Sequence, residues 1–388
     1  MSPSPRVLVI GAGVIGAAVT YYLQSAGARV TLVDRGDVGG GTSSRSDGNV
    51  LAIDKEPGYD GILALESQRL LADLAASLGP FEYRAPGSYL VLDSADELAA
   101  AESWVERERA FGLPIRFLDR KAVHDELPDL APDVPGGLYC ASDATLNPLL
   151  YTRRMVQRAR AQGALIRPHT PVRLRLQGSR VTGALTENGE RLDADMTVVA
   201  AGVWTPALTE PLALPVPIRP RKGTLLVGAR GPLHGTAKVM EFGYLMSKFG
   251  RERTVPRDIE QYGVALVYEP TASQNFLLGS SREFVGEDVT PREPVMSLIA
   301  RRALRFYPGM AQSLFIRAYA GLRPWTPDHF PLVGCVAEVP GLALAAGHEG
   351  DGIGLAAVTG RLLADLILDR KPVVDPGPLD PARFRTTP

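Results

Sequence analysis

The 388-residue sequence has few cysteines, no surplus of charge of either sign and no long apolar run. Two cysteines, Cys140 and Cys335, are too few for a disulfide framework or a cysteine-based zinc site. The 42 lysines and arginines nearly balance the 43 aspartates and glutamates, so a net charge of −1 gives no general attraction to nucleic acid or to an anionic membrane. No stretch approaches the roughly 20 consecutive apolar residues of a membrane-spanning helix. These absences predict a cytoplasmic protein with no nucleic-acid partner, no transmembrane segment and no metal site.

What the sequence does contain is enough apolar material for a sizeable core. Hydrophobic residues make up 45% of the chain and charged residues 22%, which is typical of a globular protein and argues against disorder. At roughly 150 residues per domain, the length is compatible with two or three domains. We expect two.

The N-terminal part of the chain has the pattern of a strand, a helix and a second strand. Residues 7–10 are a continuous apolar run, as in a strand buried on both faces of a parallel sheet. Small and apolar residues at 17–26 predict a helix, which Gly27 ends. Residues 29–34 predict a second strand that ends in an acidic residue. This order predicts a βαβ unit.

A Gly-x-Gly-x-x-Gly motif, formed by Gly11, Gly13 and Gly16, joins the first strand to the helix. Gly11 permits a tight turn, Gly13 lets a pyrophosphate approach the backbone, and Gly16 lets helix and strand pack closely. The helix N-terminus offers free N–H groups and partial positive charge to the phosphates. Asp34 is expected to accept hydrogen bonds from an adenosine ribose. The motif predicts a dinucleotide site for either NAD or FAD.

Hydrophobic periodicity predicts further helices and strands along the rest of the chain. The expected helices are 59–78, 98–111, 148–162, 295–306 and 354–368, and the expected strands are 87–92, 172–176, 181–186, 196–200 and 342–346. Prolines cluster at 215–220, as in a crossover between domains. Residues 222–284 alternate with a period of two and are expected to be rich in strands.

Two further segments favour FAD over NAD. The hydroxyl side chains of Thr42, Ser43 and Ser44 follow the second strand, where we expect them to hold another face of the pyrophosphate. Residues 347–354 form a second glycine-rich turn, which follows a strand and opens a helix. Such a helix N-terminus suits the pyrimidine end of a flavin, because reduction leaves negative charge there. An NAD-dependent dehydrogenase would leave this second turn unexplained.

Several separated segments carry a resemblance to a known family. They are the first glycine motif with Asp34, and residues 41–44, 198–205, 321–328 and 347–354. In this order they resemble FAD-dependent oxidoreductases of the D-amino acid oxidase superfamily, and most of all the glycine oxidase and sarcosine oxidase group. Residues 238–245 and 269–284 are similar to the flavin subunits of opine oxidases, hydroxyproline dehydrogenase and hydrogen cyanide synthase.

The resemblance implies an α/β fold in two parts. We expect a Rossmann-like FAD-binding domain and a second, mixed-sheet α+β substrate domain. The FAD-binding domain is expected to be discontinuous, with residues 1–83, 140–220 and 320–388, and the substrate domain to comprise residues 84–139 and 221–319. Sarcosine-type enzymes bind flavin covalently through a cysteine around the place of Gly321, so the glycine here implies noncovalent FAD.

The two glycine turns and the resemblance together assign a set of residues to FAD. They are Gly11, Ala12, Gly13, Val14, Ile15, Gly16, Asp34, Arg35, Thr42, Ser43, Ser44, Gly48, Asn49, Val172, Ala201, Gly202, Trp204, Arg323, Gly347, Gly350, Asp351, Gly352, Ile353 and Gly354.

Four residues are assigned to the substrate. In the superfamily, the arginine of the Gly-Leu-Arg-Pro segment binds the amino-acid carboxylate, which implies this role for Arg323. A planar guanidinium holds a carboxylate by two parallel hydrogen bonds. A structural ion pair with Asp328 is the alternative. His348, Tyr244 and Tyr268 are expected to face the flavin or the substrate, with a surface position for the histidine and a core position for the tyrosines as alternatives.

We therefore expect FAD-dependent oxidation of the C–N bond of an amino acid or N-substituted amino acid, such as an opine, an imino acid or a glycine-like substrate. Hydride transfer from Cα to flavin N5 would give an imine that hydrolyses. Two alternatives stay open. The chain would be the flavin subunit of a heteromeric dye-linked dehydrogenase, with electron-accepting partner subunits, or it would oxidise a 2-hydroxy acid.

Overall fold

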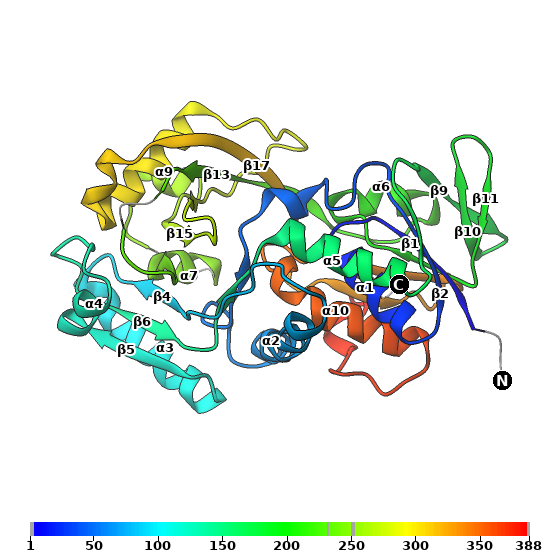
Figure 1. The fold of residues 1–388 in the computed structure, drawn as a ribbon, viewed down its shortest axis with the longest axis horizontal. Helices are drawn as coiled ribbons and strands as arrows, with labels where there is room; N and C mark the ends of the chain where they lie inside the picture. The colour runs from blue at the N-terminus through cyan, green and yellow to red at the C-terminus, as the bar shows by residue number, and fades with distance from the viewer. Residues whose placement is uncertain (1–3, 231–232, 250–252, 386–388) are drawn as a thin grey trace.

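The computed structural model describes residues 4–230, 233–249 and 253–385. Two large sheets lie in the two halves of the molecule, and the chain passes between the halves several times (Figure 1). The half that contains β1 (Arg6–Ile10) has a mostly parallel sheet, and the other half has a larger mixed sheet. This arrangement confirms the predicted α/β fold with a second, mixed-sheet part.

A six-stranded sheet forms the centre of the first half. In spatial order its strands are β18 (Leu332–Cys335), β19 (Leu342–Ala346), β12 (Met196–Val199), β1, β2 (Arg29–Val33) and β8 (Leu165–Arg167). Neighbouring strands from β19 to β8 are parallel, and β18 pairs antiparallel at one edge. The sheet therefore contains the βαβ unit that the N-terminal pattern predicts.

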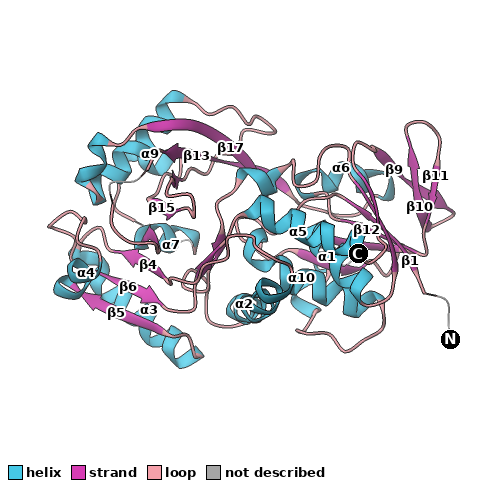
Figure 2. Cartoon of the chain, in the orientation of Figure 1, coloured by secondary structure: helices cyan, strands magenta, loops and turns pink. Residues whose placement is uncertain are grey.

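Helices cover one face of this sheet, and a small antiparallel sheet covers the other (Figure 2). The helices are α1 (Val14–Ser25), α2 (Tyr59–Ser77), α5 (Pro148–Ala161) and α10 (Gly352–Ile367), and the small sheet comprises β9 (Val172–Gln177), β10 (Arg180–Thr186) and β11 (Arg191–Asp193). Alternate residues of β1 serve the two layers. Val7 and Val9 pack with the helices, whereas Leu8 and Ile10 pack with the small sheet.

The second half is built on an eight-stranded sheet. In spatial order its strands are β17 (Phe315–Trp325), β13 (Arg219–Gly228), β16 (Phe276–Gly279), β15 (Val267–Pro270), β14 (Lys238–Glu241), β4 (Ser88–Val91), β6 (Gly136–Cys140) and β5 (Ile115–Asp119). Its helices are α3 (Leu98–Phe111), α4 (Arg120–Glu126), α7 (Phe242–Lys248), α8 (Arg257–Gln261) and α9 (Glu293–Phe306). The short helices α7 and α8 interrupt the region that the sequence predicted as strand-rich.

Short elements join the two halves, and the expected domain boundaries stay a prediction. The short elements are β3 (Asn49–Val50) and β7 (Ala144–Thr145), whereas α6 (Thr205–Thr209) packs near β9 in the first half. The long strands β13 and β17 pair with each other and cross the expected boundaries, because they begin at Arg219 and Phe315. The two strands are antiparallel, so β13 runs from the first half into the second and β17 runs back toward the first (Figure 1).

Two structural features are absent from the described residues. Within residues 4–230, 233–249 and 253–385, no helix is long and apolar enough to cross a membrane. The same residues contain no group of three or more histidine, cysteine, aspartate or glutamate side chains placed to hold a metal ion. The cytoplasmic location stays a prediction.

Candidate active site

The first glycine turn depends on two close backbone approaches. Gly11 has a φ of +110°, and a Cβ at this position would lie 2.4 Å from the carbonyl oxygen of Ala200. A Cβ at Gly16 would lie 1.8 Å from the carbonyl oxygen of Gly11. A Cβ at Gly13 would meet only the Ser43 hydroxyl, at 3.2 Å. Close backbone contacts thus require glycine at positions 11 and 16. At position 13, the absence of a side chain instead leaves space in the neighbouring cavity.

Asp34 ties this turn to the end of β2. Its carboxylate accepts a hydrogen bond of 2.6 Å from the backbone N–H of Ala12 and one of 2.7 Å from that of Gly36. The Ser43 hydroxyl accepts a hydrogen bond of 2.9 Å from the N–H of Val14, in the first turn of α1. Because a carboxylate has about four acceptor positions, Asp34 retains capacity for a ribose hydroxyl.

The second glycine turn lies at the start of α10. Gly347 has a φ of +88°, which lets the chain leave β19 and enter the helix. Gly352 and Ile353, the first two residues of α10, line the same cavity as Gly13 and Val14 at the start of α1. Two helix N-termini, each with free N–H groups and partial positive charge, therefore face one cavity.

This cavity, called here the larger cavity, has a volume of about 810 Å³, within the range of cofactor sites. The residues predicted to contact FAD that line it are Gly11, Gly13, Val14, Ile15, Asp34, Arg35, Thr42, Ser43, Val172, Ala201, Gly202, Trp204, Arg323, Gly347, Gly350, Gly352 and Ile353. The acceptor at Asp34 suits an adenosine ribose, the N-terminus of α1 a pyrophosphate, and the N-terminus of α10 an anionic flavin. The lining residues therefore fit FAD and would hold it.

The other residues predicted to contact FAD lie outside this lining. They are Ala12, Gly16, Ser44, Gly48, Asn49, Asp351 and Gly354. Gly354 has a packing role, because a Cβ there would lie 3.0 Å from the carbonyl oxygen of Asn49. The N–H of Gly48 donates to the buried Glu269 carboxylate at 2.9 Å. Contact of these residues with the cofactor stays a prediction.

Gly321 lies where β17 passes close to the loop that follows β2. A Cβ at Gly321 would lie 2.7 Å from the carbonyl oxygen of Arg45. The Thr42 hydroxyl holds the same loop by donating a 2.8 Å hydrogen bond to the carbonyl oxygen of Leu322. A cysteine at this position would displace the loop backbone, which supports noncovalent binding of FAD.

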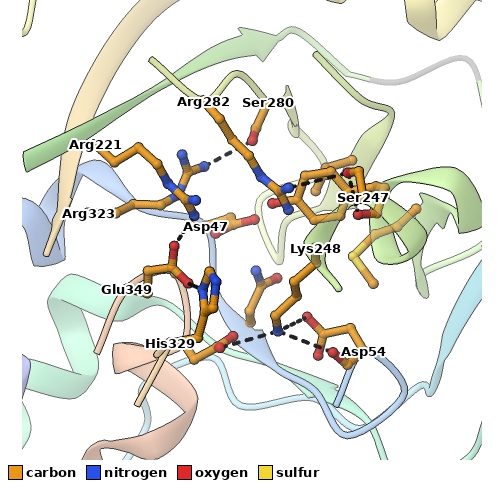
Figure 3. A pocket seen from close by; sticks show the side chains of 16 residues that line it. Asp47, Asp54, Arg221, Ser247, Lys248, Ser280, Arg282, Arg323, His329 and Glu349 are labelled. Atoms are coloured by element: carbon orange, nitrogen blue, oxygen red, sulfur yellow. Dashed lines mark hydrogen bonds and ion pairs between the residues drawn. The ribbon is translucent and has the colours of Figure 1, made fainter. Parts of the chain in front are cut away.

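A second cavity, called here the smaller cavity, has a volume of about 280 Å³ and adjoins the larger one. The two share Asp47, Arg323, Glu349 and Gly350 in their linings. Figure 3 shows mostly charged side chains around it, from the eight-stranded sheet, from α7 and from the second glycine turn. A molecule in the smaller cavity would therefore lie next to whatever occupies the α10 end of the larger cavity.

Arg323, on β17, lies at the boundary between the two cavities (Figure 3). Its guanidinium donates hydrogen bonds of 2.8 Å to the carbonyl oxygen of Ser281 and 2.9 Å to the Ser280 hydroxyl. Arg221 on β13 is its register partner, and two like charges directly opposite each other repel. The buried Glu349 carboxylate forms an ion pair with Arg221 and so offsets one of the two charges.

The ion pair with Asp328 that the sequence left open for Arg323 does not form. Asp328 pairs with Arg383 instead, at 2.6 Å. In the described part of the chain, no carboxylate lies within ion-pair distance of Arg323. Arg323 is therefore a cation that only neutral protein groups contact, at the place where a substrate carboxylate is expected.

Tyr244 and Arg282 form a further wall of the smaller cavity. The Arg282 guanidinium lies 3.8 Å from the centroid of the Tyr244 ring, and it donates a 3.4 Å hydrogen bond to the Ser247 hydroxyl. Burial raises the pKa of the Tyr244 phenol, but the charges of Arg282 and Arg323 outweigh this effect and lower it to about 8. Tyr244 is therefore largely a neutral phenol at pH 7.

The structure places Tyr268 in the core, which corrects our expectation that it faces the site. Successive residues of β15 point to opposite faces of the sheet. Val267 lines the smaller cavity, whereas Tyr268 packs against Phe276 and Tyr307. The core alternative is thus the observed one.

His348 lines the larger cavity within the second glycine turn, so the surface alternative does not apply. Its Nε2 lies 2.9 Å from the Thr359 hydroxyl oxygen. Burial lowers the pKa of His348 to about 3, so the imidazole is neutral at physiological pH. His348 therefore supplies no positive charge at this end of the cavity, whereas the N-terminus of α10 does.

Sequence reasoning missed six charged residues that line the smaller cavity. They are Asp47, Asp54, Arg221, Lys248, Arg282 and Glu349. Glu349 belongs to the second glycine turn and Asp47 closely follows the hydroxyl residues 42–44, so the polar positions in and beside these two segments were the available signal. Arg221 and Arg282 had no such signal, because the pairing of β13 with β17 places Arg221 opposite Arg323, and Arg282 lies in a loop after β16 whose Ser280 and Ser281 contact Arg323.

A family model described as FAD dependent oxidoreductase (DAO) matches residues 6–366. The chain belongs to this family. Glycine oxidase from Pseudomonas aeruginosa is 31% identical over 393 residues, which cover 98% of this chain and 99% of that protein. A hydrogen cyanide synthase subunit from the same organism is 28% identical, over 100% of this chain and 98% of that protein. The structure of glycine oxidase from Geobacillus kaustophilus superposes with a TM-score of 0.86 at 24% identity, over 99% of this chain and 100% of that chain, and so shares the fold.

Family membership confirms the resemblance to the D-amino acid oxidase superfamily and establishes FAD as the cofactor. The protein is an FAD-dependent oxidoreductase. The larger cavity agrees with this, since one continuous space connects the ribose acceptor Asp34 with the N-terminus of α10.

Gly13→Val is expected to weaken FAD binding by about 10- to 100-fold without unfolding the protein. The backbone at Gly13 is extended, with a φ of −70°, and a side chain there projects into the larger cavity with no backbone clash. The valine side chain therefore occupies space that FAD needs, and overpacking of this kind should weaken the binding free energy of FAD by about 1–3 kcal/mol. Titration of the apoprotein with FAD, followed by flavin fluorescence, measures the change.

The matched control is Gly309→Val, at an exposed glycine whose added Cβ meets no atom within 4 Å. This variant should bind FAD like the unchanged protein. Equal FAD affinity in Gly13→Val would remove the first turn from the cofactor site.

Proposed function

We propose that this flavoprotein oxidises the C–N bond of an amino acid or N-substituted amino acid. The observation that carries the proposal is the position of Arg323, an arginine without a carboxylate partner in the described part of the chain, at the junction of the two cavities. Full-length similarity to a glycine oxidase at 31% identity supports the same class of reaction.

The residues of the chain orient the substrate in this proposal. Arg323 holds the substrate carboxylate by two charge-assisted hydrogen bonds, which fixes the direction of the Cα–H bond toward the larger cavity. FAD, when bound, supplies the acceptor for the hydride that leaves Cα. The N-terminus of α10 stabilises negative charge at that end of the larger cavity.

Asp47 lies at the junction of the cavities, where its charge would act on the amine nitrogen of the substrate. Burial raises the pKa of its carboxyl, but the charge of Lys238, 2.7 Å away, outweighs this and holds the pKa below its usual value. Asp47 therefore remains ionised at neutral pH. Its negative charge stabilises the positive charge that develops on nitrogen as the imine forms.

A role as one subunit of a larger enzyme is a second candidate. It is favoured by the similarity to a protein that is itself named a subunit of hydrogen cyanide synthase. Co-purification of electron-accepting partner chains with the native protein, together with slow turnover in oxygen, would support this arrangement.

The test is anaerobic mixing of the holoenzyme with matched pairs of substrates, followed by loss of the oxidised flavin absorbance. Alanine, N-methylglycine and glutamate are compared with lactate, glycolate and 2-hydroxyglutarate, which have a hydroxyl group in place of the amine. We expect flavin reduction by at least one amine and none by the hydroxy acids. Reduction by hydroxy acids alone would overturn the proposal.

A further inference from the structure

Each carboxylate that lines the smaller cavity lies beside a cation, and Figure 3 shows this for Glu349 and Arg221 and for Asp54 and Lys248. Four carboxylates line it, and each has a cation within ion-pair distance. The pairs are Asp47 with Lys238, Glu349 with Arg221, and Asp54 and Asp351 with Lys55 and Lys248. The charge of each of these carboxylates is therefore already compensated by a neighbouring cation of the protein.

Charge is not balanced at two of the lining arginines, Arg282 and Arg323. In the part of the chain that the structure describes, neither forms an ion pair, and both donate only to neutral oxygens. The Arg282 Nε is buried and has no hydrogen-bond partner among these residues. The Tyr244 ring under Arg282 offers an aromatic face but little negative charge at pH 7. Cations in such a setting are sites for anions.

Both arginines line the smaller cavity, but only one of them also lines the larger cavity. Arg323 borders both cavities, whereas Arg282 lines the smaller cavity only. Arg323 contacts Ser280 and Ser281, so the segment that carries Arg282 begins directly beside it. A single small molecule in the smaller cavity therefore has access to both guanidinium groups.

We propose that the substrate of this site carries two carboxylates, one bound by Arg323 and the other by Arg282. This inference rests on the proposed oxidation of an amine and narrows its substrate class. An amino acid with an acidic side chain and an N-carboxyalkyl amino acid share the required chemistry. Arg221 does not take part, because the buried Glu349 already pairs with it.

Binding to the holoenzyme tests the second carboxylate without any need for oxidation. Malonate, succinate and glutarate are compared with propionate, butyrate and valerate, which have the same chain lengths but one carboxylate, by their perturbation of the flavin absorbance. A second charge-assisted interaction predicts that one dicarboxylate binds about 10- to 100-fold more tightly than its monocarboxylate partner. Equal affinities throughout the three pairs would overturn the proposal.

Arg282→Met and Arg282→Gln locate the second contact. Each should remove the preference for the dicarboxylate and leave the affinity for monocarboxylates within about 3-fold. A merely structural role, through the stacking on Tyr244, would instead weaken both classes of ligand alike and would contradict the proposal. The wild-type comparison stands even if neither variant folds.

Oxidation assays with glutamate, aspartate and iminodiacetate against alanine and N-methylglycine then distinguish the two sources of the second carboxylate. They also separate the failures of the two proposals. Flavin that no amine reduces, in a holoenzyme that still prefers dicarboxylates, would contradict only the proposed function. Flavin reduced equally well by monocarboxylic and dicarboxylic amines would contradict only the present inference.

Discussion

Arg323→Ala is expected to lower kcat/KM for an amino-acid substrate by about 100- to 1,000-fold, while FAD stays bound. Loss of one partner of a buried, hydrogen-bonded charge pair costs about 2–5 kcal/mol, and the carboxylate would lose the group that fixes its orientation. Anaerobic stopped-flow reduction of the flavin measures the effect on the chemical step, and the flavin absorbance of the purified variant measures retention of FAD.

Two further variants sharpen this prediction. Arg323→Lys keeps the charge but loses the planar fork, so its kcat/KM should fall between that of the alanine variant and that of the unchanged protein. Arg317→Ala removes an exposed arginine from the same strand, β17, and should leave kcat/KM within about 2-fold. A normal kcat/KM in Arg323→Ala would remove Arg323 from substrate binding.

The parts of the fold that the sequence predicts are those with strong local patterns. The apolar run at 7–10, the glycine motif and the helix at 17–26 are adjacent in the chain, and the structure has β1 and α1 there. The helix expected at 98–111 has those bounds in α3. In contrast, β5 and α4 were missed, because an edge strand with exposed Arg116 and Asp119 and a helix of seven residues have weak periodicity.

The residues of the candidate site likewise fall into those that local sequence predicts and those that it does not. Residues of the two glycine turns are predictable, because a backbone that must approach a phosphate or another chain segment selects glycine locally. The pair Arg221 and Arg323 is not predictable from spacing, because their contact depends on the register of β13 against β17, about a hundred positions apart in sequence. The face on which Tyr268 lies likewise depends on the pairing of β15, since a shift of one residue exchanges the two faces.

Lys238→Met is expected to destabilise the holoenzyme by about 3–5 kcal/mol at pH 7. The Lys238 Nζ is fully buried and lies 2.7 Å from Asp47 and 3.0 Å from Glu269. Burial alone would lower the pKa of the ammonium, but these two carboxylates raise it above its usual value. Removal of the cation leaves a buried carboxylate at Glu269 without a charged partner, which is the costly case. Urea unfolding followed by tryptophan fluorescence measures the loss.

The pH dependence of this loss follows from the sign of each pKa shift. Without Lys238, burial raises the carboxyl pKa values of Asp47 and Glu269, so these groups take up protons in the folded protein as the pH falls. The difference in unfolding free energy between Lys238→Met and the unchanged protein should therefore be largest near pH 8 and shrink toward pH 5.

A double variant identifies the buried carboxylate as the cause of the lost stability. Lys238→Met with Glu269→Gln should recover at least half of the loss, because the amide is neutral and its oxygen still accepts the Gly48 N–H, while Asp47, 18% exposed, retains contact with solvent. Lys121→Met provides the matched control, since its ion pair with Asp125 is exposed to solvent and adds little to stability. If Lys238→Met lowered the unfolding free energy no more than Lys121→Met does, the charge of Lys238 would not be needed to keep Glu269 buried. Other residues would then have to stabilise the buried carboxylates near Arg323.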